Sequence, residues 1–227
     1  MAALRALEPD TNGLDQLLQA FNTMVENQLS HRGTRIARRK RMARDARPRN
    51  IPAALLDDSK HLVVAYGEAT PRPPGLRKTL PSPVNWVAQR LGSPERFSCC
   101  LRQTTPLPET AMKHMRLNAA DFVDALTPRE FNNQWNQFIR PNDVLIVYHE
   151  RTSRLLQHVA PSQIRSLVLK AIFSQRDVEF HSLEELLELQ GLICPSFKFG
   201  SRADQRLAMA VQLVEHLRMK AGSFAEW

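Results

Sequence analysis

The sequence predicts an α/β fold, a mixed β-sheet flanked by helices, with an amphipathic helix and a basic linker at its N-terminal end. Three observations support this prediction. Short apolar segments joined by brief loops come first, a continuous apolar segment follows at residues 144–148, and well-capped amphipathic segments follow in turn. Three strands followed by alternating helices and strands are typical of a mixed sheet that is covered by helices.

The strands are expected where apolar residues cluster between turn residues. The expected strands are residues 61–66, 84–91, 96–101, 144–148 and 178–180. A glycine and a proline within residues 92–94 join the second and third as a hairpin. Residues 144–148 are apolar throughout, which is typical of a strand that is buried on both faces at the centre of a sheet. The segment at residues 68–75 contains three prolines and is expected to be a loop.

The helices are expected where a capping residue precedes an apolar face. The expected helices are residues 127–139, 162–172, 182–191 and 201–217. Three of them open with a Ser or Thr followed three residues later by an acid, the pattern of an N-terminal cap. The capping pairs are Thr127 with Glu130, Ser182 with Glu185 and Ser201 with Asp204. These helices would cover the sheet.

A basic stretch at residues 32–49 accounts for the net charge of the chain. It holds nine Arg and Lys residues and one acid, Asp45, while the whole chain has a formal net charge of +8. The rest of the chain is therefore balanced. The stretch is expected to bind the phosphates of nucleic acid, and the alternative is a solvated linker without a partner. The expected phosphate-binding residues are Arg32, Arg35, Arg38, Arg39, Lys40, Arg41, Arg44, Arg47 and Arg49.

Composition argues against several other classes of protein. The basic stretch offers only Ile36 and Met42 as large apolar residues, too few to enter a lipid surface, and no apolar segment approaches the ~20 residues that span a bilayer. The three cysteines have neither a disulfide framework nor a metal-ligand spacing. We therefore expect a cytoplasmic protein with reduced thiols, RNA as its partner, no membrane contact, no metal and no cofactor.

The chain is expected to have three parts. These are an N-terminal helical segment at residues 1–31, the basic linker at 32–50 and an α/β domain at 51–222. Residues 14–29 place leucines and other apolar side chains at helical spacing, so this helix needs a partner surface. Residues 1–7 look like the end of a helix that begins upstream, which leaves open whether Met1 is the true start.

The first segment, MAALRALEPDTNGLDQLLQAFNTMVENQLSHR, resembles the C-terminal end of DTW-domain proteins, the bacterial tRNA-uridine aminocarboxypropyltransferase family. The family's Asp-Thr-Trp motif, its cysteine-rich N-terminus and its S-adenosylmethionine site have no counterpart in this sequence. The resemblance therefore implies no catalytic residue here. The alternative is an ordinary amphipathic helix that docks on a protein partner or on a missing upstream domain.

Residues 58–219 resemble the RNase H-like fold of DnaQ-type (DEDD) 3′–5′ exonucleases. The segment LVVAYGEAT stands where that family has an apolar strand ending in Asp-x-Glu-Thr. HSLEELLELQGL resembles its Ser-Leu helix, and GSRADQRLAMAVQLVEHL resembles its last helix, which normally opens with His-Arg-Ala and bears an Asp. The resemblance implies an RNase H-like mixed sheet with the family's cleft beside these segments.

The sequence departs from the family at the acids that bind metal. The family's first Asp corresponds to Tyr66, its second acid is Glu68, and its last Asp falls near Arg206. Thr152 and Ser153 stand where the acid after the 144–148 strand belongs, and the final His falls near Ser201. Hydrolysis with two metal ions needs several carboxylates around two cations, and one surviving acid does not provide them.

The combined expectation is a non-catalytic module that holds RNA, presumed to be tRNA, for a DTW-type tRNA-modifying protein. The basic stretch would supply the affinity, and Arg206 would add a contact in the former catalytic cleft. Two alternatives stay open. One is a metal-dependent exonuclease with a rearranged acidic site formed by Glu68, Glu150 and Asp204. The other is a protein-interaction scaffold.

Overall fold

The computed structural model of the chain describes residues 19, 24, 51–71, 81–161, 164–173, 182–195 and 200–224. The chain divides into two units, Met1–Arg44 and Asp45–Trp227, and the fold below is that of the second. Of the first unit only Gln19 and Met24 are described, and both are helical. The basic stretch, most of the expected 14–29 helix and the expected strand at 178–180 lie outside the described residues.

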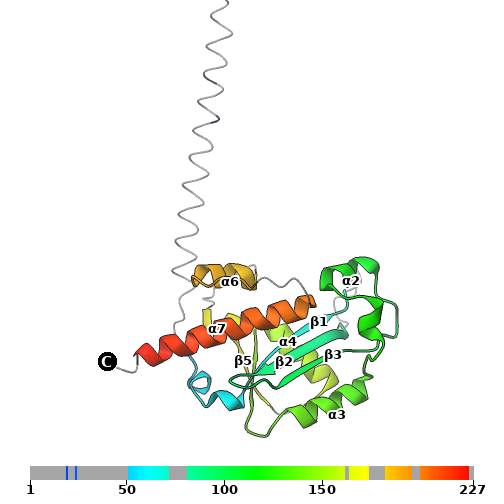
Figure 1. Cartoon of the computed structure of the whole chain (residues 1–227), viewed down its shortest axis with the longest axis horizontal. Helices are drawn as coiled ribbons and strands as arrows, with labels where there is room; N and C mark the ends of the chain where they lie inside the picture. The colour runs from blue at the N-terminus through cyan, green and yellow to red at the C-terminus, as the bar shows by residue number, and fades with distance from the viewer. Residues whose placement is uncertain are drawn as a thin grey trace, which may run out of the picture. The chain divides into compact units, whose positions relative to one another are not determined.

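The centre of the domain is a mixed sheet of five strands (Figure 1). The strands are β1 (Leu62–Ala69), β2 (Pro83–Arg90), β3 (Arg96–Cys100), β4 (Val144–Val147) and β5 (Arg165–Val168). Their order across the sheet is β3-β2-β1-β4-β5. The β1–β2 and β2–β3 pairs are antiparallel, while β1–β4 and β4–β5 are parallel. The predicted mixed sheet is confirmed.

Helices cover both faces of this sheet (Figure 1). They are α2 (Glu109–Met115), α3 (Pro128–Phe138), α4 (Glu150–Val159), α5 (Leu169–Phe173), α6 (Leu183–Leu189) and α7 (Arg202–Phe224). Short 3₁₀ turns lie at Ala53–Leu55, Ser59–His61 and Ala119–Phe122. The long helix α7 and α6 pack on one face, and α3 and α4 pack on the other.

The burial of β1 explains why its sequence is apolar without alternation. Side chains alternate between the two faces of a strand, so both faces must be apolar when helices cover both. Val64 packs against the α6 and α7 side, whereas Val63 and Ala65 pack against the α3 and α4 side. On that second side Trp86 and Trp135 meet edge to face, with ring centroids 5.8 Å apart. The sheet is therefore the middle layer of three.

The three predicted caps are confirmed. Thr127 and Glu130 form a reciprocal capping box at the start of α3. The Ser182 side chain accepts a hydrogen bond from the Glu185 amide at the start of α6. At the start of α7, the amide and hydroxyl of Ser201 both donate to Asp204 at 2.8 Å. Each cap satisfies amide groups that have no partner inside the helix.

Two sequence predictions in this domain are wrong. The expected helix at residues 162–172 is instead the edge strand β5 followed by the short helix α5, and neither α2 nor α4 was expected. The parallel pairing of β5 with β4 overrides the helical spacing of its apolar residues. The cap of α4 is His149, which is not one of the usual capping residues. Glu68, expected in a loop, lies in β1.

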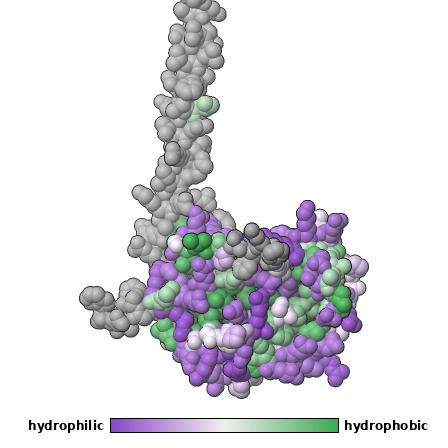
Figure 2. All heavy atoms as spheres, viewed as in Figure 1, coloured by the Kyte–Doolittle hydropathy of each residue, from purple (hydrophilic) through white to green (hydrophobic). Residues whose placement is uncertain are grey.

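Few large apolar side chains of the described residues are exposed. In Figure 2 hydrophilic residues predominate on the face shown, with apolar residues scattered between them. The exposed large apolar side chains of the domain, Leu56, Val123, Ile193 and Met219, come from four separate parts of the chain. Among the helices whose residues are described, none combines the length and the apolar character that crossing a membrane requires.

Candidate nucleic-acid interface

A cavity of about 650 Å³ lies at the C-terminal ends of β1 and β4. It is the place where the resemblance to DnaQ-type exonucleases puts the catalytic acids. β1 contributes Tyr66 and Glu68, the turn after β4 contributes Tyr148 and His149, and α4 and α7 complete the wall. The other residues of the wall that matter for charge are His114, Arg151, Arg202 and Arg206. We call this cavity the arginine cleft.

Glu68 is held by an arginine from the far end of the sequence. Its side chain is nearly buried, and Nη1 of Arg202 donates to its two carboxylate oxygens at 2.9 and 3.2 Å. Burial raises the pKa of the Glu68 carboxyl above the ordinary value, and the charge of Arg202 acts in the opposite direction. Both oxygens of the carboxylate are therefore already engaged with the arginine.

Arg206 lies one helical turn after Arg202 on α7, so both guanidinium groups reach the same cavity. Nη1 of Arg206 lies 2.8 Å from Oε2 of Glu184, which is in the first turn of α6. An arginine has five N–H donors, and one carboxylate does not use all of them. Each arginine thus combines a neutralising partner with donors that a second anion could use.

Tyr148 adds a neutral donor to the cleft. Its side chain is only 8% exposed, and its hydroxyl has no hydrogen-bond partner in the part of the chain that the structure describes. Burial raises the pKa of Tyr148 to about 12, so the hydroxyl keeps its proton at neutral pH. A buried hydroxyl without a partner is costly, and a ligand oxygen in the cleft would satisfy it.

The first turn of α4 also presents positive charge to the cleft, through Arg151. The Nδ1 atom of His149 accepts a hydrogen bond from the Arg151 amide at 3.1 Å, which caps α4. Burial lowers the pKa of His149, so the ring is neutral at neutral pH and Nε2 bears its proton. The exposed Arg151 lines the cleft as well. Among the described residues, three arginines line the cleft, and Glu68 and Glu184 pair with two of them, which leaves an excess of positive charge.

The three acids expected for a rearranged nuclease site do not come together. Only Glu68 lines the arginine cleft. Glu150 is exposed and pairs with Arg154 at 2.7 Å. Asp204 caps α7 and lines a separate cavity. Arg206 lies in the cleft, as expected, whereas the nine basic residues expected to bind phosphate all lie outside the described residues.

The two divalent cations that the fold family implies do not fit these residues. A catalytic metal pair needs several free carboxylates, and Glu68 is the one carboxylate on the described wall of the cleft. It is already bonded to Arg202, and a cation beside it would also face Arg206. Across the described ranges, no group of three or more His, Cys, Asp or Glu residues is arranged to hold a metal ion. No metal-dependent step is therefore derived for this cleft.

Sequence reasoning found Arg206 but missed Arg202, Arg151 and Tyr148 as residues of the cleft. A signal for Arg202 exists, because Arg202 and Arg206 are four residues apart in an expected helix and must share a face. Tyr148 gives no such signal, since a tyrosine at the end of an apolar strand is expected in the core.

No protein-family model matches the sequence, and no curated protein matches it either. Solved structures do match. Cell-death related nuclease 4 (CRN-4) is similar with a TM-score of 0.53 and 11% identity, over 70% of this chain and 64% of that one. The nuclease domain of 3′hExo, a DEDDh family member bound to rAMP, is similar with a TM-score of 0.53 and 11% identity. The match covers 70% of this chain and 94% of that one. Exonuclease X in complex with 5′-overhanging duplex DNA is similar with a TM-score of 0.50 and 12% identity. The match covers 70% of this chain and 93% of that one.

These similarities show the fold. The domain is an RNase H-like mixed sheet flanked by helices, the fold of DEDDh exonuclease domains. The chain matches somewhat less than two thirds of the length of cell-death related nuclease 4. At this level of identity, the activity of the neighbours does not transfer to this chain.

Proposed function

We propose that this domain binds RNA through the arginine cleft without hydrolysing it, and that the basic stretch at residues 32–49 adds further phosphate contacts. The observation that supports the proposal is the pair Arg202 and Arg206. These arginines line the cleft where the fold family has its catalytic acids, with Glu68 as the one carboxylate of the described wall.

The chemistry of the cleft suits a phosphate. Guanidinium groups bind phosphate oxygens through paired N–H donors, and these charged hydrogen bonds are stronger than neutral ones. The unpartnered hydroxyl of Tyr148 offers one more donor to a phosphate oxygen. Most of the affinity of proteins for nucleic acid comes from such phosphate contacts.

The ligand class is supported by the neighbours in fold. One was solved bound to rAMP and another in complex with 5′-overhanging duplex DNA, so two proteins of this fold bind a nucleotide or nucleic acid. The choice of tRNA, and a role beside a DTW-type tRNA-modifying protein, rest on the resemblance of the first 32 residues alone. The choice of tRNA and the role beside a DTW-type protein are the most specific part of the proposal.

The test is binding of tRNA to the full chain across a salt series. Each phosphate contact contributes roughly 0.7–0.9 to the slope of log K against log salt concentration. Arg206→Gln should lower the slope by about one contact, and neutralising Arg38, Arg39, Lys40 and Arg41 together should lower it by several. Tyr148→Phe should weaken binding without changing the slope, because the hydroxyl is uncharged.

Arg129→Gln is the matched control, since Arg129 is exposed on α3, which packs on the opposite face of the sheet from α7. It removes the same charge and should leave the slope nearly unchanged. If Arg129→Gln and Arg206→Gln lower the slope equally, the arginine cleft is not the binding site. If the wild-type chain binds no RNA at low salt, the proposal fails altogether.

Exonuclease activity is the competing function, favoured by the fold of the neighbours. It predicts shortening of oligonucleotides that requires Mg²⁺ or Mn²⁺ and is abolished by Glu68→Gln. We expect no shortening under conditions where RNA binding is saturated.

A further inference from the structure

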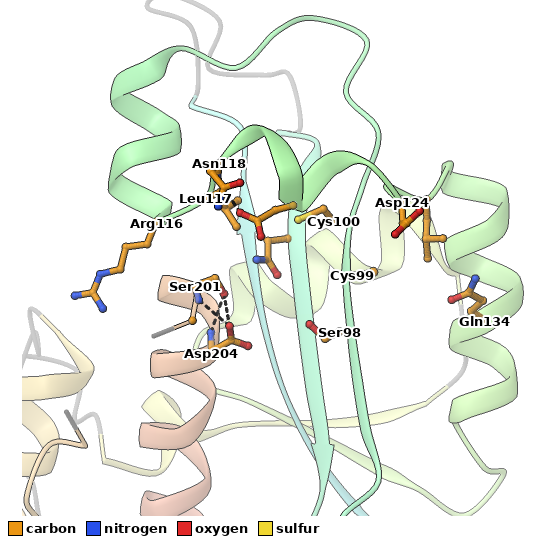
Figure 3. Close-up of a pocket in the computed structure, with 14 residues that line it drawn as sticks. Ser98, Cys99, Cys100, Arg116, Leu117, Asn118, Asp124, Gln134, Ser201 and Asp204 are labelled. Atoms are coloured by element: carbon orange, nitrogen blue, oxygen red, sulfur yellow. Dashed lines mark hydrogen bonds between the residues drawn. The ribbon is translucent and has the colours of Figure 1, made fainter. Parts of the chain in front are cut away.

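A second cavity, of about 590 Å³, opens beside the N-terminal end of α7 (Figure 3). β2 and β3 contribute its inner wall, and the segment between α2 and α3 contributes its outer wall. In Figure 3 Ser201 and Asp204 of α7 lie on one side, while Asp124 and Gln134 lie on the other. The proposed RNA-binding function does not involve this cavity.

Carboxylates dominate the charge of this cavity, which we call the acidic cavity. Its wall contains three aspartates, Asp121, Asp124 and Asp204, and one arginine, Arg116. Asp121 accepts a hydrogen bond from the Asn118 amide at 2.7 Å, and Asp204 is engaged by Ser201 and by Arg96. Asp124 is exposed and makes no hydrogen bond or ion pair within the described ranges. The acidic cavity therefore has one free carboxylate at its edge.

The second observation is a buried amide that lacks a partner. Asn85 lines the acidic cavity from β2, its side chain is only 5% exposed, and its Oδ1 atom has no hydrogen bond in the described structure. Asn85 sits between Glu68 of β1 and Cys100 of β3 in the sheet, so the strand cannot turn it toward water. A buried acceptor without a donor is unfavourable, and this one lies on the wall of an open cavity.

These two features select a ligand by charge and by hydrogen bonding. Asn85 Oδ1 and the Asp124 carboxylate both accept, so the ligand must donate, and the excess of carboxylates favours a positive charge. A nucleobase would also donate, but bases are normally held by stacking on aromatic rings. The described wall of the acidic cavity contains no Phe, Tyr or Trp. Cationic nitrogen groups remain as the class that fits.

We propose that the acidic cavity binds a guanidinium or primary ammonium group, which donates a hydrogen bond to Asn85 Oδ1 and is attracted by the free Asp124 carboxylate at the edge of the cavity. Such a group can come from an arginine or lysine side chain of a protein partner, or from a free polyamine. The proposal does not depend on RNA binding in the arginine cleft, because the two cavities have no residue in common.

The experiment is an NMR titration of the full chain that follows the backbone amides of Asn118, Asp121 and Ser201 at the cavity. The probes are N-acetyl-arginine methylamide, its neutral isostere N-acetyl-citrulline methylamide, and spermidine. The arginine derivative should bind about tenfold more tightly than the citrulline derivative, because a charged donor is roughly twice as strong as a neutral one. Tighter binding of spermidine than of the arginine derivative would identify a polyamine site, and the reverse would identify a side-chain site.

Two variants test the residues. Asp124→Asn should weaken the arginine derivative about threefold to fivefold, as expected for an exposed ion pair. Glu215→Gln makes the same change of charge at an exposed position of α7 that does not line the acidic cavity, and should leave the affinity unchanged. Asn85→Val should weaken binding about tenfold while the stability of the protein stays the same or rises, because an unsatisfied amide is removed.

Two results would overturn the proposal. The first is equal affinity for the arginine and citrulline derivatives, which would show that positive charge is not recognised. The second is an Asn85→Val protein that is folded and binds as wild type, since the buried amide would then have no ligand.

Discussion

Neutralising Glu68 separates the two functions that this fold allows, because they predict effects of opposite sign. Glu68 is the one carboxylate on the described wall of the arginine cleft, and Arg202 donates to both of its oxygens. If the cleft binds phosphate, Glu68→Gln removes a negative charge and frees Arg202, so affinity for RNA must increase. If the cleft binds catalytic metal, the same substitution must abolish activity.

The size of the increase follows from Coulomb's law. A phosphate on the outer donors of Arg202 would lie roughly 7 Å from the Glu68 carboxylate, and a half-open cleft has an effective dielectric constant of roughly 40. The repulsion that is removed is then about 1 kcal/mol, or about fivefold to tenfold in affinity. Glutamine keeps the shape of the side chain, so the packing of Glu68 against α7 is preserved.

The pH dependence of RNA affinity provides an internal control for this prediction. Burial raises the pKa of Glu68 in the folded protein above the ordinary glutamate value. As the pH falls from the raised value toward the ordinary value, Glu68 of the folded wild type takes up a proton. The wild-type affinity should rise in that window and approach the affinity of Glu68→Gln. By linkage, the unfolding free energy of wild type relative to Glu68→Gln should fall as the pH rises through the same window.

The assay is fluorescence anisotropy with a labelled tRNA at constant ionic strength, over a pH series for both proteins. Both proteins have the same groups in the cleft apart from residue 68, so the ratio of the two affinities at each pH isolates the charge of Glu68. A ratio near one at neutral pH would refute the electrostatic reasoning. A loss of affinity in Glu68→Gln would show that the Glu68–Arg202 pair positions the arginine in a way that outweighs the repulsion.

Three further predictions concern the stability of the domain. Asp143→Ala should lower the free energy of unfolding by about 3–5 kcal/mol in chemical denaturation. Arg90, whose side chain is 1% exposed, would lose the buried carboxylate that lies 2.6 Å from its Nη1 atom. The double variant Asp143→Ala, Arg90→Met should recover part of that loss. Gly67→Ala should cost about 1–3 kcal/mol, since a Cβ atom there would clash with the Trp86 ring. Thr127→Ala should lower the free energy of unfolding by about 1 kcal/mol in the same assay, because the cap of α3 is lost. No change in the free energy of unfolding would show that tertiary packing alone fixes the start of that helix.

The parts of the fold that local chemistry determines could be predicted from the sequence. The caps of α3, α6 and α7 each depend on two residues three positions apart, so they can be read without knowledge of the rest of the chain. The central strand β4 is apolar throughout because helices cover both of its faces. These features are local, and for that reason they were found.

The parts that depend on distant residues could not be predicted. β5 becomes a strand because it pairs with β4, and its own sequence has helical spacing. The ion pair of Glu68 and Arg202 joins residues 134 positions apart, and no spacing rule connects them. The orphaned amide of Asn85 is visible only when β1, β2 and β3 are aligned. The chemistry of both cavities therefore comes from the tertiary structure.

The Glu68–Arg202 pair also explains how a nearly buried acid is accommodated in this cleft. Arg202 and Arg206 lie one turn apart on α7, and like charges at that spacing destabilise a helix. Glu68 neutralises the first arginine from β1, and Glu184 neutralises the second from α6. Each carboxylate thus allows a guanidinium group to be partly buried in the cleft while some of its N–H donors stay available. Glu68 thus balances the charge of Arg202 without using all of its donors, an arrangement that suits a phosphate-binding cleft better than a metal-binding one.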